Sequence, residues 1–171
     1  NKFTWISDRD GWRHVYSYSS DGKNLKLITP GEFDVIKLLR MDNNEEHFYY
    51  IASPENPSQR YLYRVSKDGS GNERVTPDSE IKGTHNYNIS PDGSHAIVSS
   101  SSAENPPVTK LVTLPDYKVI KVFEDNEKLK KKFNNLKKSP VEYFYVDIGD
   151  GHRLHSKCIK PPNFDPNKKY P

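Results

Sequence analysis

Two blocks of this sequence repeat each other and decide the fold. Residues 13–30 read RHVYSYSSDGKNLKLITP, and residues 60–77 read RYLYRVSKDGSGNERVTP. The blocks align without a gap at an offset of 47 residues. Seven aligned pairs are identical, including an Asp-Gly dipeptide and a closing Thr-Pro, and three further pairs are apolar. Self-similarity at this period is typical of repeat architectures.

A third copy of the repeat is weaker. The stretch SPENP at 53–57 matches SAENP at 102–106, at an offset of 49 residues. At the same offset, Leu111 aligns with Leu62, and Leu114 aligns with Val65. The repeat therefore extends over about the first 120 residues.

Each copy predicts a β-hairpin by its own chemistry. An alternating strand leads into Asp21-Gly22 or Asp68-Gly69, and Asp-Gly accepts the positive φ of a tight turn. Four strands are predicted between residues 84 and 123, around a third Asp-Gly at Asp92-Gly93, and four more at 35–39, 48–52, 60–65 and 73–76. Four antiparallel strands repeating every ~40–50 residues are the signature of a β-propeller blade. A β-sandwich or a β-meander is the alternative.

Composition supports an all-β chain and narrows its partners. The 171 residues include thirteen prolines and eleven tyrosines, as expected for many short strands and turns. A net charge of +3 gives no reason to expect a nucleic-acid partner. The single cysteine, Cys158, excludes an internal disulfide framework and a multi-cysteine metal site, and no cofactor is expected. The sequence opens at Asn1 without an initiating Met, and we expect it to be an excised segment.

The composition changes after residue 123. Residues 124–138 read EDNEKLKKKFNNLKK, and Leu129, Phe133 and Leu136 form one stripe of a short helix that Asp125 or Asn126 can cap. The lysines are interpreted as a solvated face, with an anionic partner as the alternative. A hairpin follows, with strands at 141–148 and 153–159. We therefore predict a partial propeller of about three blades at 1–123, a linker with a helix at 124–140, and the opening of a second domain at 141–171.

No catalytic constellation is evident. The nucleophile elbow G-x-S-x-G, a phosphate-binding glycine loop and H-E-x-x-H are all missing. His152 and His155 are three apart on a predicted strand, so they point to opposite faces and are not expected to bind one metal ion. The serines considered as substitutes, Ser70 and Ser156, lie in a hairpin turn and on a strand. We predict no catalytic, substrate-binding or metal-binding residue in this segment.

Several residues allow two interpretations. Asp8, Arg9 and Asp10 precede Gly11-Trp12 and either make a turn or contact a ligand at a propeller rim. Asn88 lies in an Asn-Ile-Ser glycosylation pattern that is followed by Pro91. Cys158 is interpreted as a small buried apolar side chain. Trp5, Trp12 and the tyrosines are predicted to form the core between blades, with an aromatic platform for a ligand as the alternative.

Four stretches of the sequence resemble the dipeptidyl peptidase IV family of prolyl-oligopeptidase-type serine peptidases. They are WISDRDGWRHVY at 5–16, LITPGEFDV at 27–35, FEDN at 123–126 before a short helix, and KPPNFDPNKKYP at 160–171. The last, similar to the family's entry into its α/β-hydrolase domain, is the most specific. The resemblance covers essentially the whole chain in order, although similar hairpins also occur in TolB-like and prolyl-oligopeptidase propellers.

The resemblance implies a serine exopeptidase that releases N-terminal Xaa-Pro or Xaa-Ala dipeptides. An eight-bladed propeller would cap a hydrolase domain that carries Ser, Asp and His, in a homodimeric protein that is secreted, periplasmic or at the cell surface. The family's nucleophile motif is missing from this segment. Glu45-Glu46 lacks the aromatic surroundings of the family's paired-glutamate motif, so that role is not carried over.

The implied partners are the remaining blades and the hydrolase domain of the same parent chain, together with the peptide substrate. The segment itself would be non-catalytic and would wall and gate the active-site chamber. The alternative function is a stand-alone propeller that binds a protein or a glycan.

Overall fold

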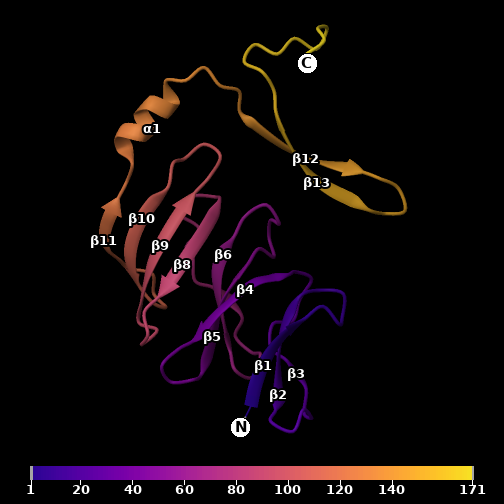
Figure 1. Cartoon of the computed structure of the whole chain (residues 1–171), viewed down its shortest axis with the longest axis vertical. Coiled ribbons are helices and arrows are strands. Elements are labelled where there is room, and N and C mark those ends of the chain that lie inside the picture. The colour runs from indigo at the N-terminus through magenta and orange to yellow at the C-terminus, as the bar shows by residue number, and fades with distance from the viewer. Residues whose placement is uncertain (1, 171) are drawn as a thin grey trace. The chain divides into compact units, whose positions relative to one another are not determined.

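The computed structural model of the chain describes residues 2–170, which form two compact units (Figure 1). The first unit contains the described residues up to Ser102 together with Pro107–Asp125. The second contains Ala103–Pro106 and the residues from Asn126 onward. No helix among residues 2–170 is long and apolar enough to cross a membrane.

The first unit consists of three antiparallel sheets, in which each strand pairs with its neighbours in sequence. Blade 1 contains β1 (Lys2–Ser7), β2 (His14–Ser19) and β3 (Lys26–Leu27). Blade 2 contains β4 (Val35–Met41), β5 (His47–Ala52), β6 (Tyr61–Ser66) and β7 (Glu73–Arg74). Blade 3 contains β8 (Thr84–Ile89), β9 (His95–Ser101), β10 (Val108–Thr113) and β11 (Val119–Glu124). The chain is thus an all-β partial propeller, in which blade 1 has three strands among residues 2–170 and blades 2 and 3 have four each.

The two repeated hairpins have the same register. Tyr16 lies opposite Leu27 in blade 1, and Tyr63 lies opposite Arg74 in blade 2, which is the same pairing displaced by the 47-residue offset. Gly22 and Gly69 have φ values of +75° and +82°, which Asp-Gly turns require. The predicted equivalence of the two hairpins is therefore confirmed.

The second strand of each repeated hairpin is shorter than predicted. Residues 73–76 were expected to form a strand, but β7 ends at Arg74. The backbone N–H of Leu62 donates to the hydroxyl of Thr76 at 2.8 Å instead of to a backbone carbonyl. The carbonyl oxygen of Leu62 still accepts from the backbone N–H of Val75 at 2.8 Å, so the threonine side chain replaces one of the two hydrogen bonds at the position where the strand ends.

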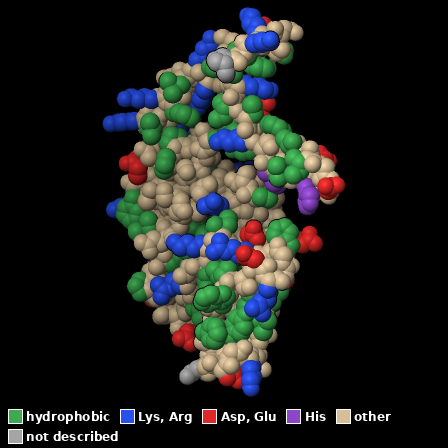
Figure 2. Space-filling model, turned by 45° about the vertical axis from the view of Figure 1, so that its right-hand side comes forward, with side chains coloured by type: hydrophobic (Ala, Val, Ile, Leu, Met, Phe, Trp, Pro, Cys, Tyr) green, Lys and Arg blue, Asp and Glu red, His purple; other side chains and the backbone are tan. Residues whose placement is uncertain are grey.

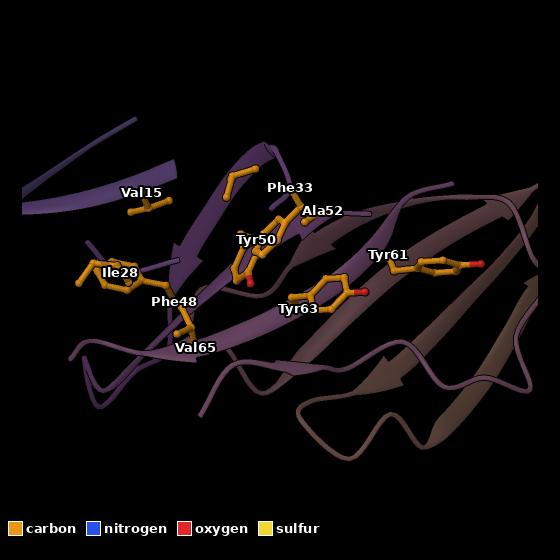
Figure 3. Close-up of a cluster of buried hydrophobic side chains, with 10 residues drawn as sticks. Val15, Ile28, Phe33, Phe48, Tyr50, Ala52, Tyr61, Tyr63 and Val65 are labelled. Carbon is orange, nitrogen blue, oxygen red and sulfur yellow. The ribbon is translucent and has the colours of Figure 1, made fainter. Parts of the chain in front are cut away.

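Strands of blade 2 are buried on both faces. The hydrophobic core therefore lies between blade 2 and each of its two neighbouring blades. Val15 and Ile28 of blade 1 pack against Phe48, Tyr50 and other residues of blade 2 in the first cluster (Figure 3). The alternate residues of β5 and β6 belong to a second cluster with blade 3, whose members are Tyr49, Ile51, Leu62, Val75, Tyr87, Ala96, Val98, Val112, Leu114 and Tyr117. Period-two alternation thus divides one sheet between two interfaces.

The two tryptophans are exposed, unlike the tyrosines of the core. Six tyrosines are buried in the two clusters, as predicted, but Trp5 is 64% exposed and Trp12 is 40% exposed. The prediction that both tryptophans form the core is therefore wrong for the described residues. Trp12 lies in the loop between β1 and β2, and Trp5 lies on β1, which has a strand on one side only among residues 2–170.

The second unit contains α1 (Glu127–Asn134) and a hairpin of β12 (Val141–Asp147) and β13 (Arg153–Ile159). Asn126 is the N-cap residue, but it has φ +54° and its side chain makes no capping hydrogen bond. Leu136 lies beyond the helix end, so the predicted three-residue stripe is reduced to Leu129 and Phe133. Cys158 on β13 is only partly buried, unlike the buried side chain that was predicted.

Candidate functional site

A groove of about 870 Å³ lies between blades 1 and 2 of the first unit. Its lining combines β1 and β2 of blade 1 with the end of β4 and the start of β5. The lining residues are Lys2, Phe3, Thr4, Ser17, Leu38, Leu39, Arg40, Met41, Glu45, Phe48 and Lys67. The lining therefore mixes apolar side chains with polar and charged ones.

Two of the four charged side chains that line the groove are engaged by the protein itself. Arg40 donates from Nη1 to the carbonyl oxygen of Ser90 at 2.7 Å, so its guanidinium joins blade 2 to the β8–β9 turn of blade 3. Lys67 pairs with Glu46 at 2.5 Å, and that hydrogen bond raises the pKa of Lys67. Arg40 thus acts as a bridge between blades, not as a ligand for an anion.

The predicted rim loop forms a turn above the aromatic side chains of β2. The backbone N–H of Gly11 donates to the carbonyl of Asp8 at 3.1 Å. The guanidinium carbon of Arg9 lies 5.0 Å from the ring centre of Tyr16 and 5.6 Å from that of Tyr18. Burial raises the pKa of Tyr16 to about 12, and the neighbouring Asp10 carboxylate adds to the shift. The loop therefore has a clear packing role.

Two histidines are buried in the first unit. His14 lies on β2 with Nδ1 3.4 Å from the hydroxyl of Thr29. His85 lies on β8 with Nδ1 3.1 Å from the carbonyl oxygen of Arg60, while its Nε2 is buried without a hydrogen-bond partner among the described residues. Burial lowers the pKa of His85, which favours the neutral ring.

A serine–histidine contact occurs that the sequence did not suggest. The hydroxyl of Ser94 lies 2.6 Å from Nδ1 of His95 and 2.6 Å from Oδ2 of Asp92. In a catalytic triad the acid would orient the histidine from its far nitrogen. Here the acid contacts the serine itself, inside the Asp92-Gly93 turn. Hydrogen bonds from Ser90 and Ser94 hold the pKa of Asp92 well below its usual range, so this cluster stabilises a turn.

The other residues considered for chemistry lie apart from one another. Ser70 donates to Asp68 at 2.6 Å in the β6–β7 turn, and Ser156 lies on β13. His152 lies in the turn before β13, whereas His155 is on that strand with its ring 4.3 Å from Tyr145. Within residues 2–170, no group of three His, Cys, Asp or Glu side chains is placed to hold a metal ion.

Two further positions from the sequence can be located. Glu45 and Glu46 lie in the β4–β5 turn, and both are exposed. Asn88 is exposed on β8, the first strand of blade 3.

A comparison with known protein families shows which family this chain belongs to. Residues 1–107 match the family described as dipeptidyl peptidase IV (DPP IV) N-terminal region. The chain belongs to the dipeptidyl peptidase IV family. It is 31% identical over 167 residues to dipeptidyl peptidase 4 of Trichophyton equinum, and 27% identical over 168 residues to a probable dipeptidyl peptidase 4 of Aspergillus flavus.

Solved structures of the dipeptidyl peptidase IV family show the same fold. Dipeptidyl peptidase 4 of Porphyromonas gingivalis matches 100% of this chain with a TM-score of 0.86 and 27% identity. A putative dipeptidyl aminopeptidase IV from Bacteroides ovatus matches 99% with a TM-score of 0.74 and 22% identity. The alignment with the T. equinum relative covers 97% of this chain but 21% of that protein, so the chain spans about a fifth of the relatives it matches.

Proposed function

We propose that this chain is a non-catalytic propeller segment of a serine exopeptidase that releases N-terminal Xaa-Pro or Xaa-Ala dipeptides. The longer protein to which the segment would belong is called the parent protein. The observation that carries the proposal is the match to dipeptidyl peptidases 4 over 97% of the chain, across both compact units. The blades supply the architectural part of such an enzyme.

The proposed role of the blades is to wall the active-site chamber and to limit entry to short or unfolded peptide ends. In a propeller, one end strand of each blade lines the central channel, and we assign this position to β4 and β8. Their exposed side chains are polar, namely Lys37, Asn86 and Asn88. Such a lining would admit a peptide without binding it tightly.

The proposed domain boundaries remain those of the sequence: blades at 1–123, a linker at 124–140 and the start of an α/β-hydrolase domain at 141–171. Support comes from β12 of the second hairpin, which carries apolar or aromatic side chains on both faces. Tyr143 and Tyr145 alternate along β12 with Phe144 and Val146, and all four are at least 40% exposed. A strand that needs cover on both faces suits a sheet with helices on each side, as in α/β domains.

The segment is proposed to be inactive by itself. Acyl transfer of this kind needs an activated serine, a histidine base oriented by an acid, and an oxyanion hole. A triad needs the acid to contact the histidine, but at the Ser94–His95 contact the acid, Asp92, contacts the serine. In the parent protein the triad would come from the hydrolase domain.

The test is hydrolysis of a Gly-Pro chromogenic amide. We expect no turnover by the 171-residue chain and clear turnover by the parent protein, abolished when the serine of a G-x-S-x-G motif is replaced by Ala. Turnover by the purified chain that survives Ser70→Ala, Ser94→Ala and Ser156→Ala would overturn the proposal. A parent without such a motif that still binds proteins or glycans would support a stand-alone binding propeller instead.

A further inference from the structure

Five Asp-Gly dipeptides occur in this chain, and one of them differs from the other four in its contacts. Asp-Gly is prone to spontaneous ring closure, because glycine has no side chain to hinder attack by its backbone nitrogen on the preceding carboxyl group. In a folded protein the rate depends on how firmly these two groups are held. The dipeptides begin at Asp10, Asp21, Asp68, Asp92 and Asp150.

In four of the five dipeptides the glycine N–H is held by the backbone. Each of these N–H groups donates to the carbonyl oxygen three residues earlier, so the nitrogen is turned into the protein. The bonds run from Gly11 to Asp8 at 3.1 Å, from Gly22 to Ser19 at 2.9 Å, from Gly69 to Ser66 at 2.8 Å and from Gly93 to Ser90 at 2.9 Å. Such a bond must break before the nitrogen can attack. We call these four the reference turns.

The carboxylates of the reference turns are held as well. Each accepts a hydrogen bond from the backbone N–H two residues later, at Trp12, Lys23, Ser70 and Ser94 respectively. Hydrogen bonds from side chains contribute most to lowering the pKa of all four carboxyls, and these backbone bonds add to the effect. A firmly ionised carboxylate resists attack, because oxygen leaves far less readily from it than water leaves from the protonated acid.

The fifth dipeptide, Asp150-Gly151, has neither restraint. It lies in the turn between β12 and β13, which is closed by hydrogen bonds from Ile148 N–H to His152 and from His152 N–H to Gly149, at 3.0 and 2.9 Å. Among residues 2–170, the N–H of Gly151 has no acceptor and the carboxylate of Asp150 has no donor. Both residues are exposed, and Figure 2 shows acidic and histidine side chains open to solvent at the tip of this hairpin.

We propose that Asp150 is a site of spontaneous isomerisation to isoaspartate. The backbone nitrogen of Gly151 attacks the side-chain carboxyl carbon of Asp150, a C–N bond forms, and the carboxyl hydroxyl leaves with the amide proton as water. Water then adds to one of the two carbonyl carbons of the resulting succinimide and breaks its bond to the nitrogen. Opening at the side-chain carbonyl restores aspartate, and opening at the main-chain carbonyl gives isoaspartate. No other reactant is needed.

The product would change the hairpin at the point that sets its register. In isoaspartate the backbone runs through the former side chain, so the turn gains one methylene group and a free main-chain carboxylate. Both hydrogen bonds that close the turn span Asp150, and the strand pairing begins directly beyond them at Asp147 and Arg153. Because the turn fixes the register of a hairpin, we expect these two bonds to weaken in the isomerised protein.

The primary experiment follows isoaspartate in the parent protein during storage in warm neutral buffer. Isoaspartate is labelled with an isoaspartate methyltransferase and located by peptide fragmentation. We expect position 150 to isomerise at least about tenfold faster than any reference turn, because there a hydrogen bond must break first. In the denatured parent all five sites should react at similar rates. Position 150 reacting no faster than the reference turns in the folded parent would overturn the proposal.

Matched substitutions give a second readout that does not depend on labelling. Asparagine closes the same ring with loss of ammonia, so reaction at an introduced Asn-Gly changes the peptide mass. We expect Asp150→Asn to react at least about tenfold faster than Asp21→Asn in the folded parent, and at the same rate after denaturation. Equal rates in the folded state would refute the difference between the two turns. Asp150→Glu, which would have to form a larger ring, should yield no isomerised product at this position.

Hydrogen–deuterium exchange tests the effect on the hairpin. Relative to fresh protein, stored parent should exchange the amides of Ile148 and His152 faster, whereas the amides of β5 should be unchanged. Stored Asp150→Glu protein is the control for other damage. Unchanged exchange at Ile148 in fully isomerised protein would overturn the assigned effect. These outcomes are separable from the proposed peptidase activity, because neither the isomer nor amide exchange is read through hydrolysis of a substrate.

Discussion

The hydroxyl of Thr76 accepts a hydrogen bond from the backbone N–H of Leu62 at 2.8 Å, inside the core between blades 2 and 3. The same contact occurs one repeat earlier, where Thr29 accepts from the N–H of Val15 at 2.9 Å. In both copies the two residues are fourteen positions apart. A proline follows each threonine. Because proline has no backbone N–H, no donor is left without a partner at the point where the strand pairing ends. The repeated Thr-Pro is therefore a device that ends the outer strand while satisfying a buried donor.

Removing the Thr76 hydroxyl is expected to destabilise the propeller. Thr76→Val keeps the shape but leaves the buried N–H of Leu62 unpaired, which costs about 1–3 kcal/mol. Thr76 also lies 2.7 Å from the hydroxyl of Tyr87, so a second contact is lost. Denaturant unfolding of the parent protein measures the change, and Thr76→Ser is the control that should recover most of it. Equal stability of the Val and Ser variants would refute the role assigned to the hydroxyl.

Two glycines of the Asp-Gly turns should respond differently to alanine. A Cβ on Gly69 would lie 3.0 Å from the carbonyl oxygen of Leu27, whereas a Cβ on Gly22 would meet nothing within 4 Å. Both substitutions impose the left-handed penalty of about 1–2 kcal/mol. In the 171-residue chain we expect Gly69→Ala to destabilise clearly more than Gly22→Ala, because it also pushes blade 2 away from blade 1. Equal losses in thermal unfolding would show that the turn does not pack against blade 1 in solution.

Stability is expected to fall below about pH 6.5 because of His85. Burial lowers the pKa of this histidine from 6.5, and the nearby groups are Glu80, Arg74 and the carbonyl of Arg60. In the folded state the ring stays neutral, while the unfolded chain takes up a proton as the pH drops below 6.5. Stability is therefore lost between pH 6.5 and the lowered pKa of the folded state.

The measurement is the unfolding temperature of the parent protein as a function of pH. His85→Gln should flatten the profile in this window, and His152→Gln, at an exposed turn, is the matched control. The assignment to His85 fails if the His85→Gln variant keeps the slope of the unmodified protein.

The side chains that we propose to face the channel should control substrate size without affecting chemistry. Asn88→Trp adds bulk to an exposed position of β8, so it should narrow the proposed entry route. We expect slower cleavage of peptides longer than about ten residues and an unchanged rate with a Gly-Pro chromogenic amide. Lys118→Trp, on the exposed loop between β10 and β11, is the control. An equal effect on both substrates would argue against a gating role for β8.

Much of the fold follows from local chemistry in the sequence. The Asp-Gly dipeptides predict tight turns, and the alternation of side chains around Tyr16 and Tyr63 predicts strands. Together these two signals suffice to predict the two hairpins. The burial of the tryptophans could not be predicted in this way. Whether Trp5 is covered depends on a neighbouring strand, and no local pattern reveals which segment supplies it.

The candidate site was less predictable than the fold. The groove arises where β1 meets β4, and these strands belong to different blades, so no spacing in the sequence indicates it. The contact of Arg40 with Ser90 joins residues fifty positions apart for the same reason. In contrast, the Asp8–Asp10 turn and the Asp92 cluster are local, and the sequence identifies the polar residues that form them.

We propose above that blades 1, 2 and 3 are consecutive blades of a longer peptidase. An experimental structure of the parent protein tests it most directly. We expect blades 1, 2 and 3 to be neighbours in one ring, with β4 and β8 on the channel. We also expect β12 and β13 inside the hydrolase sheet. Blades 1 and 2 in unrelated topologies, or a parent in which these sheets form a closed domain without a hydrolase, would contradict the account.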